Sequence, residues 1–252
     1  MLNKQNKYLG QHFLKNKKIL EEMARAAEIS KKDIVLEVGP GTGTLTEILA
    51  PRAKKMIAIE KDRELVALLR EKFRHYKNVE IVYGDILKFR TSDFEFQISQ
   101  PFKIVSNLPY YITSRFLRLF LTQTEFRSKL MVLMVQKEVA ERILARDGKE
   151  SLLSLSVKAY AKAEIIRRVS KNLFSPPPKV DSAIIKISDI SSNFFKQNKI
   201  DEKNFFEVLR AAFQKKRKML RHSLKQFKIP QKYQNRRPEE LSLEDWVKIV
   251  VK

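Results

Sequence analysis

The chain of 252 residues contains no cysteine, and this absence excludes several kinds of site at once. The protein can form no disulfide, bind no metal through thiolates and use no cysteine nucleophile. Histidine is nearly as scarce, with three residues, and the sequence shows no cluster of metal ligands. A chain of this kind suits a reducing compartment, so we expect a cytoplasmic protein without a metal centre.

Long apolar runs and acidic residues are also in short supply. Residues 1–20 mix lysine, asparagine and glutamine and contain no apolar run of the length that a signal peptide or membrane span requires. Lys and Arg number 51 against 29 Asp and Glu, which leaves a formal net charge of +22. Such an excess predicts a polyanionic partner, and neither charged end carries the broad apolar face of a membrane-surface helix.

The positive charge is concentrated at the two ends of the chain. Lys203–Arg237 contains twelve basic residues and one acidic residue, and Met1–Lys18 contains five basic residues and none that is acidic. A single lysine is ordinarily a solvated surface residue, but this concentration predicts contacts with nucleic-acid phosphates. The basic residues expected to make them cluster in one segment: Lys215, Lys216, Arg217, Lys218 and Arg221.

Short apolar runs alternate with segments of helical periodicity in the first part of the chain. The runs that predict strands are Ile34–Val38, Met56–Ile59, Val79–Tyr83, Lys103–Val105 and Leu130–Val135. Asn16–Ile29 and Asp62–Phe73 have the spacing of amphipathic helices. This alternation predicts an α/β fold, with a mainly parallel sheet covered by helices on both faces.

The later part of the chain has a different pattern. Gln136–Arg146 predicts a helix, and two late strands follow at Glu164–Val169 and Val180–Ile187, joined by a hairpin-type connection around three prolines. Ser188–Asn198 is polar and predicts a loop, and Lys203–Lys252 predicts basic helices. We therefore expect two domains, residues 1–187 with a basic N-terminal arm and a small helical domain at residues 188–252.

A glycine-rich turn follows the first predicted strand directly. It contains Gly39, Gly41 and Gly43 and opens a helix at Thr44. Glycines let a ligand approach the backbone closely, although such a turn can also be purely structural. Thr44 stands where a dinucleotide-binding fingerprint has its third glycine, so nicotinamide or flavin binding is disfavoured.

Acidic residues end the next two predicted strands. Glu60 follows the glycines by about twenty residues, where a carboxylate accepts hydrogen bonds from both ribose hydroxyls. Asp85 ends the third strand, where it can accept from an adenine amino group while Ile86 packs on the ring. The carboxyl ends of parallel strands meet at one crevice, so the pattern predicts a nucleoside cofactor.

The fourth predicted strand ends in Asn107-Leu108-Pro109-Tyr110. An adenine amino nitrogen is a poor nucleophile because its lone pair is delocalised into the ring. The Asn107 side-chain oxygen and the Leu108 carbonyl offer acceptors to its two N–H groups, and Pro109 fixes the turn. Tyr110 is placed to stack on an extruded base. Taken alone, the tetrapeptide could be a structural turn, but its order after Glu60 and Asp85 favours base methylation.

These motifs resemble those of the KsgA/RsmA-type ribosomal RNA adenine dimethyltransferases, and the resemblance spans most of the chain. The matching segments are Gly10–Leu14, Glu37–Gly43, Glu60–Asp62, Gly84–Asp85, Asn107–Tyr110, Gln136–Val139, Phe174–Ala183 and Lys216–Leu224. The resemblance implies a Rossmann-like class I methyltransferase sheet with S-adenosylmethionine as the cofactor. It implies dimethylation of adjacent adenosines near the 3′ end of small-subunit (16S) ribosomal RNA, coupled to ribosome biogenesis.

The resemblance also implies roles for individual residues. Those matching cofactor contacts in the family are His12, Leu14, Gly39, Glu60, Asp85 and Asn107. Phe174 matches an aromatic residue that holds the target base opposite Tyr110. We expect a monomer whose partner is small-subunit ribosomal RNA or a precursor small subunit, with no membrane involved.

Two other functions remain open from the sequence alone. The erythromycin-resistance methyltransferases modify an adenine of large-subunit RNA, but Lys179–Ser182 and the basic segment ending at Leu224 favour the small-subunit family. A ribosome-assembly or RNA-binding factor could use the basic ends with minor catalysis. The intact Asn107–Tyr110 turn favours an enzyme, because a pure binder has no evident need for it.

Overall fold

The computed structural model describes residues 13–14, 16–89, 101–122, 128–145, 148–215 and 217–251. The chain forms two compact units. The first, the sheet unit, comprises Met1–Ala140 and Glu164–Ile190, and the second, the helical unit, comprises Glu141–Ala163 and Ser191–Lys252. Glu141–Ala163 thus groups with the C-terminal helices, whereas the sequence pattern predicted it in the first domain. The functions expected of the two domains stay predictions.

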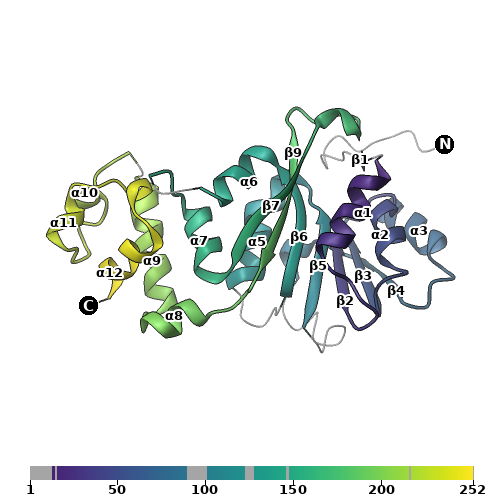
Figure 1. Ribbon diagram of the computed structural model, residues 1–252, viewed down its shortest axis with the longest axis horizontal. Helices are drawn as coiled ribbons and strands as arrows, with labels where there is room; N and C mark the ends of the chain where they lie inside the picture. Colours follow the sequence, from purple (N-terminus) through teal and green to yellow (C-terminus); the bar gives the residue numbers. More distant parts are fainter. Residues whose placement is uncertain are drawn as a thin grey trace. The chain divides into compact units, whose positions relative to one another are not determined.

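A seven-stranded sheet forms the centre of the sheet unit, in the order β4-β3-β2-β5-β6-β9-β7 (Figure 1). The strands from β4 to β6 are parallel, and β9 runs antiparallel to β6. Their bounds are β2 (Ile34–Val38), β3 (Lys55–Glu60), β4 (Val79–Tyr83), β5 (Phe102–Asn107), β6 (Ser128–Gln136), β7 (Lys162–Val169) and β9 (Ser182–Ser188). This arrangement confirms the predicted α/β sheet.

The connection between β7 and β9 is more elaborate than a hairpin. It contains the short turn η4 (Lys171–Leu173) and the strand β8 (Phe174–Ser175). β8 pairs with β1 (Phe13–Leu14), with Leu14 opposite Phe174. A segment at the N-terminus and the segment before β9 therefore lie side by side.

Helices α1 (Lys17–Ala26) and α2 (Thr44–Leu49) pack on one face of the sheet. Their apolar residues form one cluster with Val35, Met56 and Val105 from three neighbouring strands. Helix α5 (Thr113–Thr122) covers the opposite face, where Phe120 meets Phe102 with ring centroids 6.3 Å apart. Phe102 and Val105 differ by an odd number of positions on β5, so they point to opposite faces.

Two helices in the sheet unit begin where side chains can cap them. Asn16 accepts from the backbone N–H of Lys18 at the start of α1. Asp62 accepts from the first amides of α3 (Arg63–Lys72), which contacts β3 and β4. Both residues satisfy N–H groups that have no partner inside the helix. The predicted helices at Asn16–Ile29 and Asp62–Phe73 are confirmed within a few residues.

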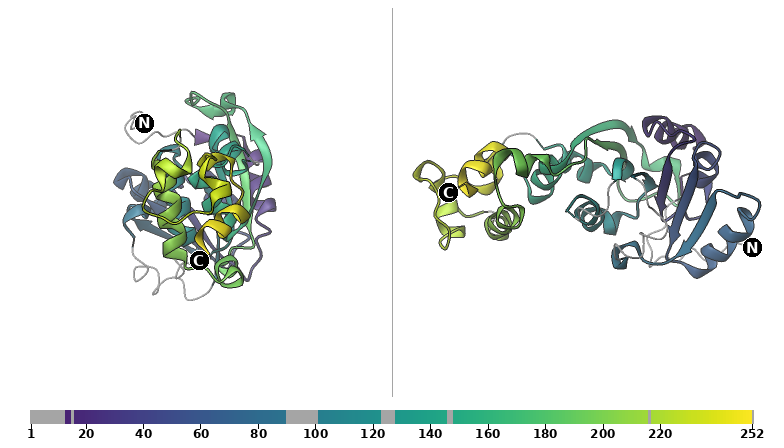
Figure 2. Two further views of the ribbon diagram at one scale, coloured as in Figure 1. Left: turned by 90° about the vertical axis from the view of Figure 1, so that its left-hand side faces the viewer. Right: turned by 90° about the horizontal axis from the view of Figure 1, so that it is seen from below.

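The helical unit has an aromatic core. Tyr160, Phe195, Phe205 and Phe206 lie with ring centroids 5.2–5.9 Å apart along their contacts. Its C-terminal helices are the green-to-yellow ribbons in the left panel of Figure 2. Its elements are α7 (Leu152–Tyr160), α8 (Asn193–Asn198), α9 (Glu202–Gln214), α10 (Leu220–Ser223), α11 (Gln231–Gln234), η5 (Pro238–Glu240) and α12 (Leu243–Val250), and α6 (Lys137–Ile143) begins in the sheet unit and ends here.

Helix α8 contradicts the loop predicted for Ser188–Asn198. The segment is polar overall, but Phe195 is buried and its ring lies 5.2 Å from that of Tyr160. Packing of this aromatic side chain stabilises a helix that the polar composition disfavours, because tertiary burial outweighs weak local propensity.

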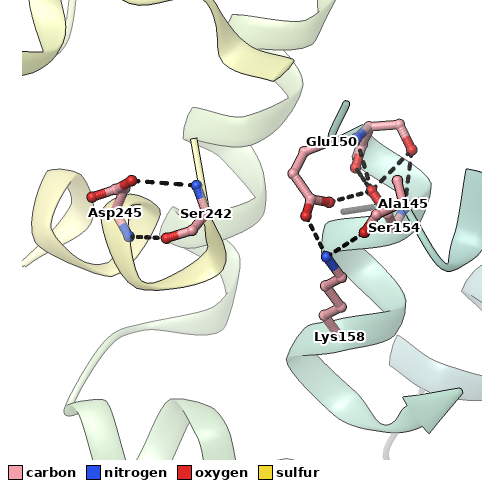
Figure 3. A network of polar contacts seen from close by, with 7 residues as sticks. Ala145, Glu150, Ser154, Lys158, Ser242 and Asp245 are labelled. Atoms are coloured by element: carbon pink, nitrogen blue, oxygen red, sulfur yellow. Dashed lines mark hydrogen bonds and ion pairs between the residues drawn. The ribbon is translucent and has the colours of Figure 1, made fainter. Parts of the chain in front are cut away.

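A buried carboxylate organises the start of α7 (Figure 3). Glu150 accepts from the Ser154 hydroxyl at 2.6 Å and from the Lys158 ammonium. Lys158 also donates to the Ala145 carbonyl at 2.7 Å, and the Glu150 amide donates to Glu239 at 2.9 Å. These contacts join the segment before α7 to the C-terminal half of the same unit.

Candidate active site

A pocket lies at the carboxyl ends of the parallel strands β2, β3 and β5 and just beyond β4. This is the edge at which open α/β sheets bind their ligands. Ten residues predicted from the sequence as site residues line it: Leu14, Gly39, Gly41, Glu60, Asp85, Ile86, Asn107, Leu108, Pro109 and Tyr110. The structure therefore brings together residues that are up to 96 positions apart in the chain.

The glycine-rich turn has a backbone that requires glycine at two points in particular. Gly43 has φ +78°, and a Cβ atom there would lie 2.6 Å from the Phe73 ring of the neighbouring helix. Gly39 has φ +66°, and a Cβ atom would lie 3.4 Å from Pro109. The turn thus packs against α3 on one side and against the Asn107–Tyr110 segment on the other, which leaves its backbone at the pocket wall.

Glu60 is held at the end of β3 by backbone amides. Its Oε2 accepts from Gly41 at 3.2 Å, and its Oε1 accepts from Lys61 at 2.8 Å and Asp62 at 3.0 Å. The residue is 6% exposed, and burial raises the pKa of Glu60 above its ordinary value despite these bonds. A carboxylate with this orientation can still accept from hydroxyl groups of a ligand.

Asp85 also lines the pocket, and it is paired with Lys61, a residue that sequence reasoning missed. Its Oδ2 lies 2.9 Å from the Lys61 ammonium, and its Oδ1 accepts from the Leu87 amide at 3.1 Å. Burial works to raise the pKa of Asp85, but Lys61 and Leu87 outweigh it and hold the pKa below the ordinary value. The position of Lys61 directly after Glu60 was the available signal.

Glu37 is a second pocket residue that sequence reasoning did not single out. It is 2% exposed within β2 and accepts from the Thr46 hydroxyl at 2.7 Å. Burial raises the pKa of Glu37 to about 8, and the nearby Glu60 charge adds to the effect. An acidic residue inside an otherwise apolar strand was the signal, because a buried carboxyl group requires a special partner.

The Asn107–Tyr110 segment presents acceptors at the pocket. Among the described residues, none hydrogen-bonds the Asn107 side-chain amide or donates to the Leu108 carbonyl. The Leu108 amide donates to Met134 at 3.2 Å, which fixes this peptide to β6. Ser106 donates to the Val38 carbonyl at 2.6 Å, so the ends of β5 and β2 are joined next to the pocket residues Val38 and Asn107.

Not every predicted site residue lies in this pocket. Phe174 is 4% exposed and packs in the core cluster. Its backbone on β8 pairs with that of the pocket residue Leu14 on β1. His12 and Lys216 lie outside the described residues, as does most of the basic N-terminal arm. The other predicted RNA-binding residues belong to the helical unit.

The four described residues of the basic cluster are exposed: Lys215, Arg217, Lys218 and Arg221. Within the described part of the chain, none of them forms an ion pair with a carboxylate. No carboxylate in the described ranges therefore neutralises their charge. Over the same described ranges, no three potential metal-ligating side chains gather, and no helix has the length and apolarity to cross a bilayer.

Comparison with known proteins places this geometry in a family. A model of the ribosomal RNA adenine dimethylase family matches residues 2–249. Ribosomal RNA small subunit methyltransferase A of Dehalococcoides mccartyi is 43% identical, over 95% of this chain and 85% of the relative. The protein of the same name from Clostridium botulinum is 40% identical, over 97% of this chain and 92% of the relative.

Solved structures agree with the sequence relatives. A dimethyladenosine transferase from Plasmodium falciparum superposes with a TM-score of 0.77 and 30% identity, covering 94% of this chain and 95% of that one. The 23S rRNA methyltransferase ErmE gives a TM-score of 0.72 and 26% identity, covering 94% and 97%. These neighbours are class I methyltransferases, which confirms the predicted fold class. The protein is an enzyme, and the chain belongs to the ribosomal RNA adenine dimethylase family.

Proposed function

We propose that this enzyme uses S-adenosylmethionine to dimethylate the N6 atoms of adjacent adenosines near the 3′ end of small-subunit ribosomal RNA during ribosome biogenesis. The observation that carries the proposal is the Asn107–Tyr110 segment, whose two acceptors stand beside a pocket suited to a nucleoside. Relatives named small subunit methyltransferases reach 43% identity, against 26% for the 23S enzyme, which favours the small subunit.

The residues of the pocket fit S-adenosylmethionine. Glu60 offers carboxylate oxygens oriented by three backbone amides, which suits a ribose diol. Asp85 offers an acceptor for the adenine amino group, with Ile86 beside it as an apolar surface. Leu14, Gly39 and Gly41 provide the remaining walls. When bound, the cofactor supplies the methyl group that is transferred.

The target adenine would enter between the acceptors and the aromatic side chain of Tyr110. In the first transfer, the Asn107 side-chain oxygen and the Leu108 carbonyl would each accept one N–H of the amino group, which localises the nitrogen lone pair toward the donor. The methylated nitrogen would then release one proton to solvent, and in the second transfer its single remaining N–H would be accepted by one of the two groups. Catalysis then depends on positioning and on these two acceptors. Tyr110 stacks on one face of the base, and Phe174, reached by rearrangement of its segment, would hold the other.

The basic residues would hold the RNA. The cluster formed by Lys215, Lys216, Arg217, Lys218 and Arg221, together with the N-terminal arm that includes His12, supplies charges for the phosphates of small-subunit RNA or a precursor subunit. The four described cluster residues are exposed and carry no ion pair with a described carboxylate, which supports this role. We further propose that the protein acts as a monomer in the cytoplasm.

The test measures transfer of labelled methyl groups to unmethylated small subunits, to large subunits and to a non-ribosomal RNA, followed by nucleoside analysis. Label should appear as dimethyladenosine in the small subunit. Asn107→Ala should lower turnover by about 100-fold or more, because one of the two acceptors is removed. Asn193→Ala provides the matched control, since it removes an exposed asparagine amide from the helical unit.

Each alternative has a distinct result. Label found only in large-subunit RNA would indicate an enzyme of the resistance type. RNA binding without transfer would indicate an assembly factor. Full activity of Asn107→Ala would contradict the chemistry proposed for the turn.

A further inference from the structure

A hydrogen bond joins the tip of the Tyr110 side chain to a strand far away in the sequence. The Tyr110 hydroxyl lies 2.7 Å from the Ser182 hydroxyl, across 72 positions of sequence. Ser182 is fully buried at the start of β9, and its backbone pairs in register with Gln136 at the end of β6. The partner of the tyrosine is therefore fixed by the sheet itself.

The preceding residue, Asp181, contacts two other segments. Its carbonyl accepts from the Lys137 amide at 3.0 Å, at the beginning of α6. Its carboxylate accepts from the Lys171 amide at 3.0 Å, at the beginning of η4, the turn that leads to Phe174. Two consecutive residues thus hold Tyr110 and the segment that carries Phe174.

Such a contact has a specific consequence for a stacking residue. A tyrosine ring on two side-chain torsions can swing unless its far end is held, and a stacked base requires the ring in one plane. Burial raises the pKa of Tyr110, so its hydroxyl keeps its proton at physiological pH and remains available for the hydrogen bond. Tyr110 is half-buried and lines the pocket, and its hydroxyl contacts Ser182 of β9.

We propose that Asp181 and Ser182 are positioning residues: Ser182 holds the Tyr110 ring for stacking on the target base, and Asp181 anchors η4, where the segment begins that would rearrange to bring Phe174 to the other face of the base. This inference rests on the proposed function. Neither residue touches the reacting atoms, and each acts through the aromatic side chain or segment that it holds. A buried serine with a purely structural role would use its hydroxyl in a hydrogen bond that has no effect on methyl transfer.

A double-mutant cycle tests the contact between Ser182 and Tyr110. Ser182→Ala and Tyr110→Phe each remove one hydroxyl of the bond and keep the remaining side chain. Each variant should lower kcat for methyl transfer about tenfold, with the calorimetric affinity for S-adenosylmethionine unchanged. The double variant should be no slower than either single variant, because both changes break the same hydrogen bond. Ser182→Thr, which keeps a hydroxyl, should restore most of the activity.

Ser128→Ala is the matched control. Ser128 is also buried, lies at the opposite end of β6 and donates to the Leu130 carbonyl at 3.1 Å. This variant should keep the wild-type kcat even if its stability falls. Should Ser182→Ala fail to fold, as judged by circular dichroism, the half-buried Tyr110→Phe still tests the contact through its own decrease in kcat.

Asp181 is exposed, so its variants are expected to fold. Asp181→Ala should lower kcat, whereas Asp181→Asn should retain activity because its side-chain oxygen can still accept from the Lys171 amide. RNA with 2-aminopurine at the target position reports base extrusion, and its fluorescence change should shrink in Ser182→Ala and Asp181→Ala but not in Ser128→Ala.

Three results would overturn the inference. The first is a kcat of Ser182→Ala equal to that of Ser128→Ala while wild-type enzyme transfers methyl groups normally, which would leave the proposed function intact. The second is a double variant whose decrease in kcat equals the product of the two single decreases. The third is an absence of transfer by the wild-type enzyme on every RNA, which would remove the proposed function as well.

Discussion

Both units of the molecule bury a carboxylate, and they use it in different ways. In the sheet unit Glu60 accepts from three backbone amides and lines a pocket. In the helical unit Glu150 has both oxygens bonded to side chains of the next two helical turns, Ser154 and Lys158. A carboxylate held by backbone amides keeps its negative charge directed at a ligand, whereas one paired with a lysine stabilises the fold.

The two cores differ as well. The sheet unit packs aliphatic residues such as Val35 and Ile104 on the two faces of a regular sheet. The helical unit packs aromatic rings between short helices, including Phe213 against Trp246 at 6.1 Å. The regular sheet gathers strand ends at one edge, which creates a site. Short helices with large aromatic residues create a stable support for an exposed basic surface.

The largest expected effect concerns Glu150, the buried carboxylate of the helical unit. Lys158→Met should lower the free energy of unfolding of the helical unit by about 3–5 kcal/mol, because it leaves Glu150 buried without its cation. Lys55→Met is the control, since Lys55 and Glu80 form a half-exposed pair at 2.8 Å that should contribute about 1 kcal/mol or less. Denaturant unfolding measures both. Equal decreases would mean that burial of Glu150 does not govern the pair.

Glu37, the buried carboxyl group within β2, should make the stability of the sheet unit depend on pH. The pKa of Glu37 rises from 4.5 to about 8 on folding, so the folded state binds the proton more tightly. Stability should therefore fall as pH rises from about 4.5 to about 8, and Glu37→Gln should remove this dependence. The gain of the variant over wild type should grow by up to roughly 3 kcal/mol between about pH 5.5 and pH 8. Thermal unfolding across this range is the measurement, and parallel curves would contradict the shift.

The two carboxylates that we propose to bind the cofactor, Glu60 and Asp85, should give the next largest effect. Glu60→Ala should weaken S-adenosylmethionine binding by about 100-fold and Asp85→Ala by about tenfold, because hydrogen bonds to charged groups contribute about 1.5–3 kcal/mol. Glu64→Ala, an exposed acid on α3, serves as the control for removal of negative charge. Isothermal titration calorimetry measures all three. Unchanged affinity in both site variants would show that the cofactor binds elsewhere.

The smallest effect concerns the basic surface of the helical unit. Replacing Arg217 and Arg221 by glutamine should weaken RNA binding about tenfold and reduce the salt dependence of log affinity by roughly 0.7–0.9 for each phosphate that is no longer neutralised. Replacing the exposed Lys31 and Lys32 of the sheet unit removes the same charge and should change the slope less. Filter binding over a range of salt provides the slopes. Equal slopes in the two double variants would locate the RNA away from the cluster.

Much of the candidate site could be predicted because parallel strands impose a simple rule. Glu60 and Asn107 end β3 and β5, Asp85 lies two residues beyond β4, and the carboxyl ends of parallel strands meet at one edge. Lys61 and Glu37 were missed, although Lys61 directly follows Glu60 and Glu37 lies two residues before Gly39. Their importance comes from a contact at 2.9 Å with Asp85 and from burial, and neither is visible in local composition.

The amino-acid sequence by itself determined the alternating strands and helices, the glycine turn and the order of the pocket residues, since these follow from local periodicity and backbone conformation. Tertiary structure alone decided the contact of Tyr110 with Ser182, the helix at Asn193–Asn198 and the grouping of Glu141–Ala163 with the C-terminal helices. These features join residues that are distant in sequence, and their free energy comes from burial and from hydrogen bonds between segments. No local pattern encodes such contacts, because they exist only after the chain has packed.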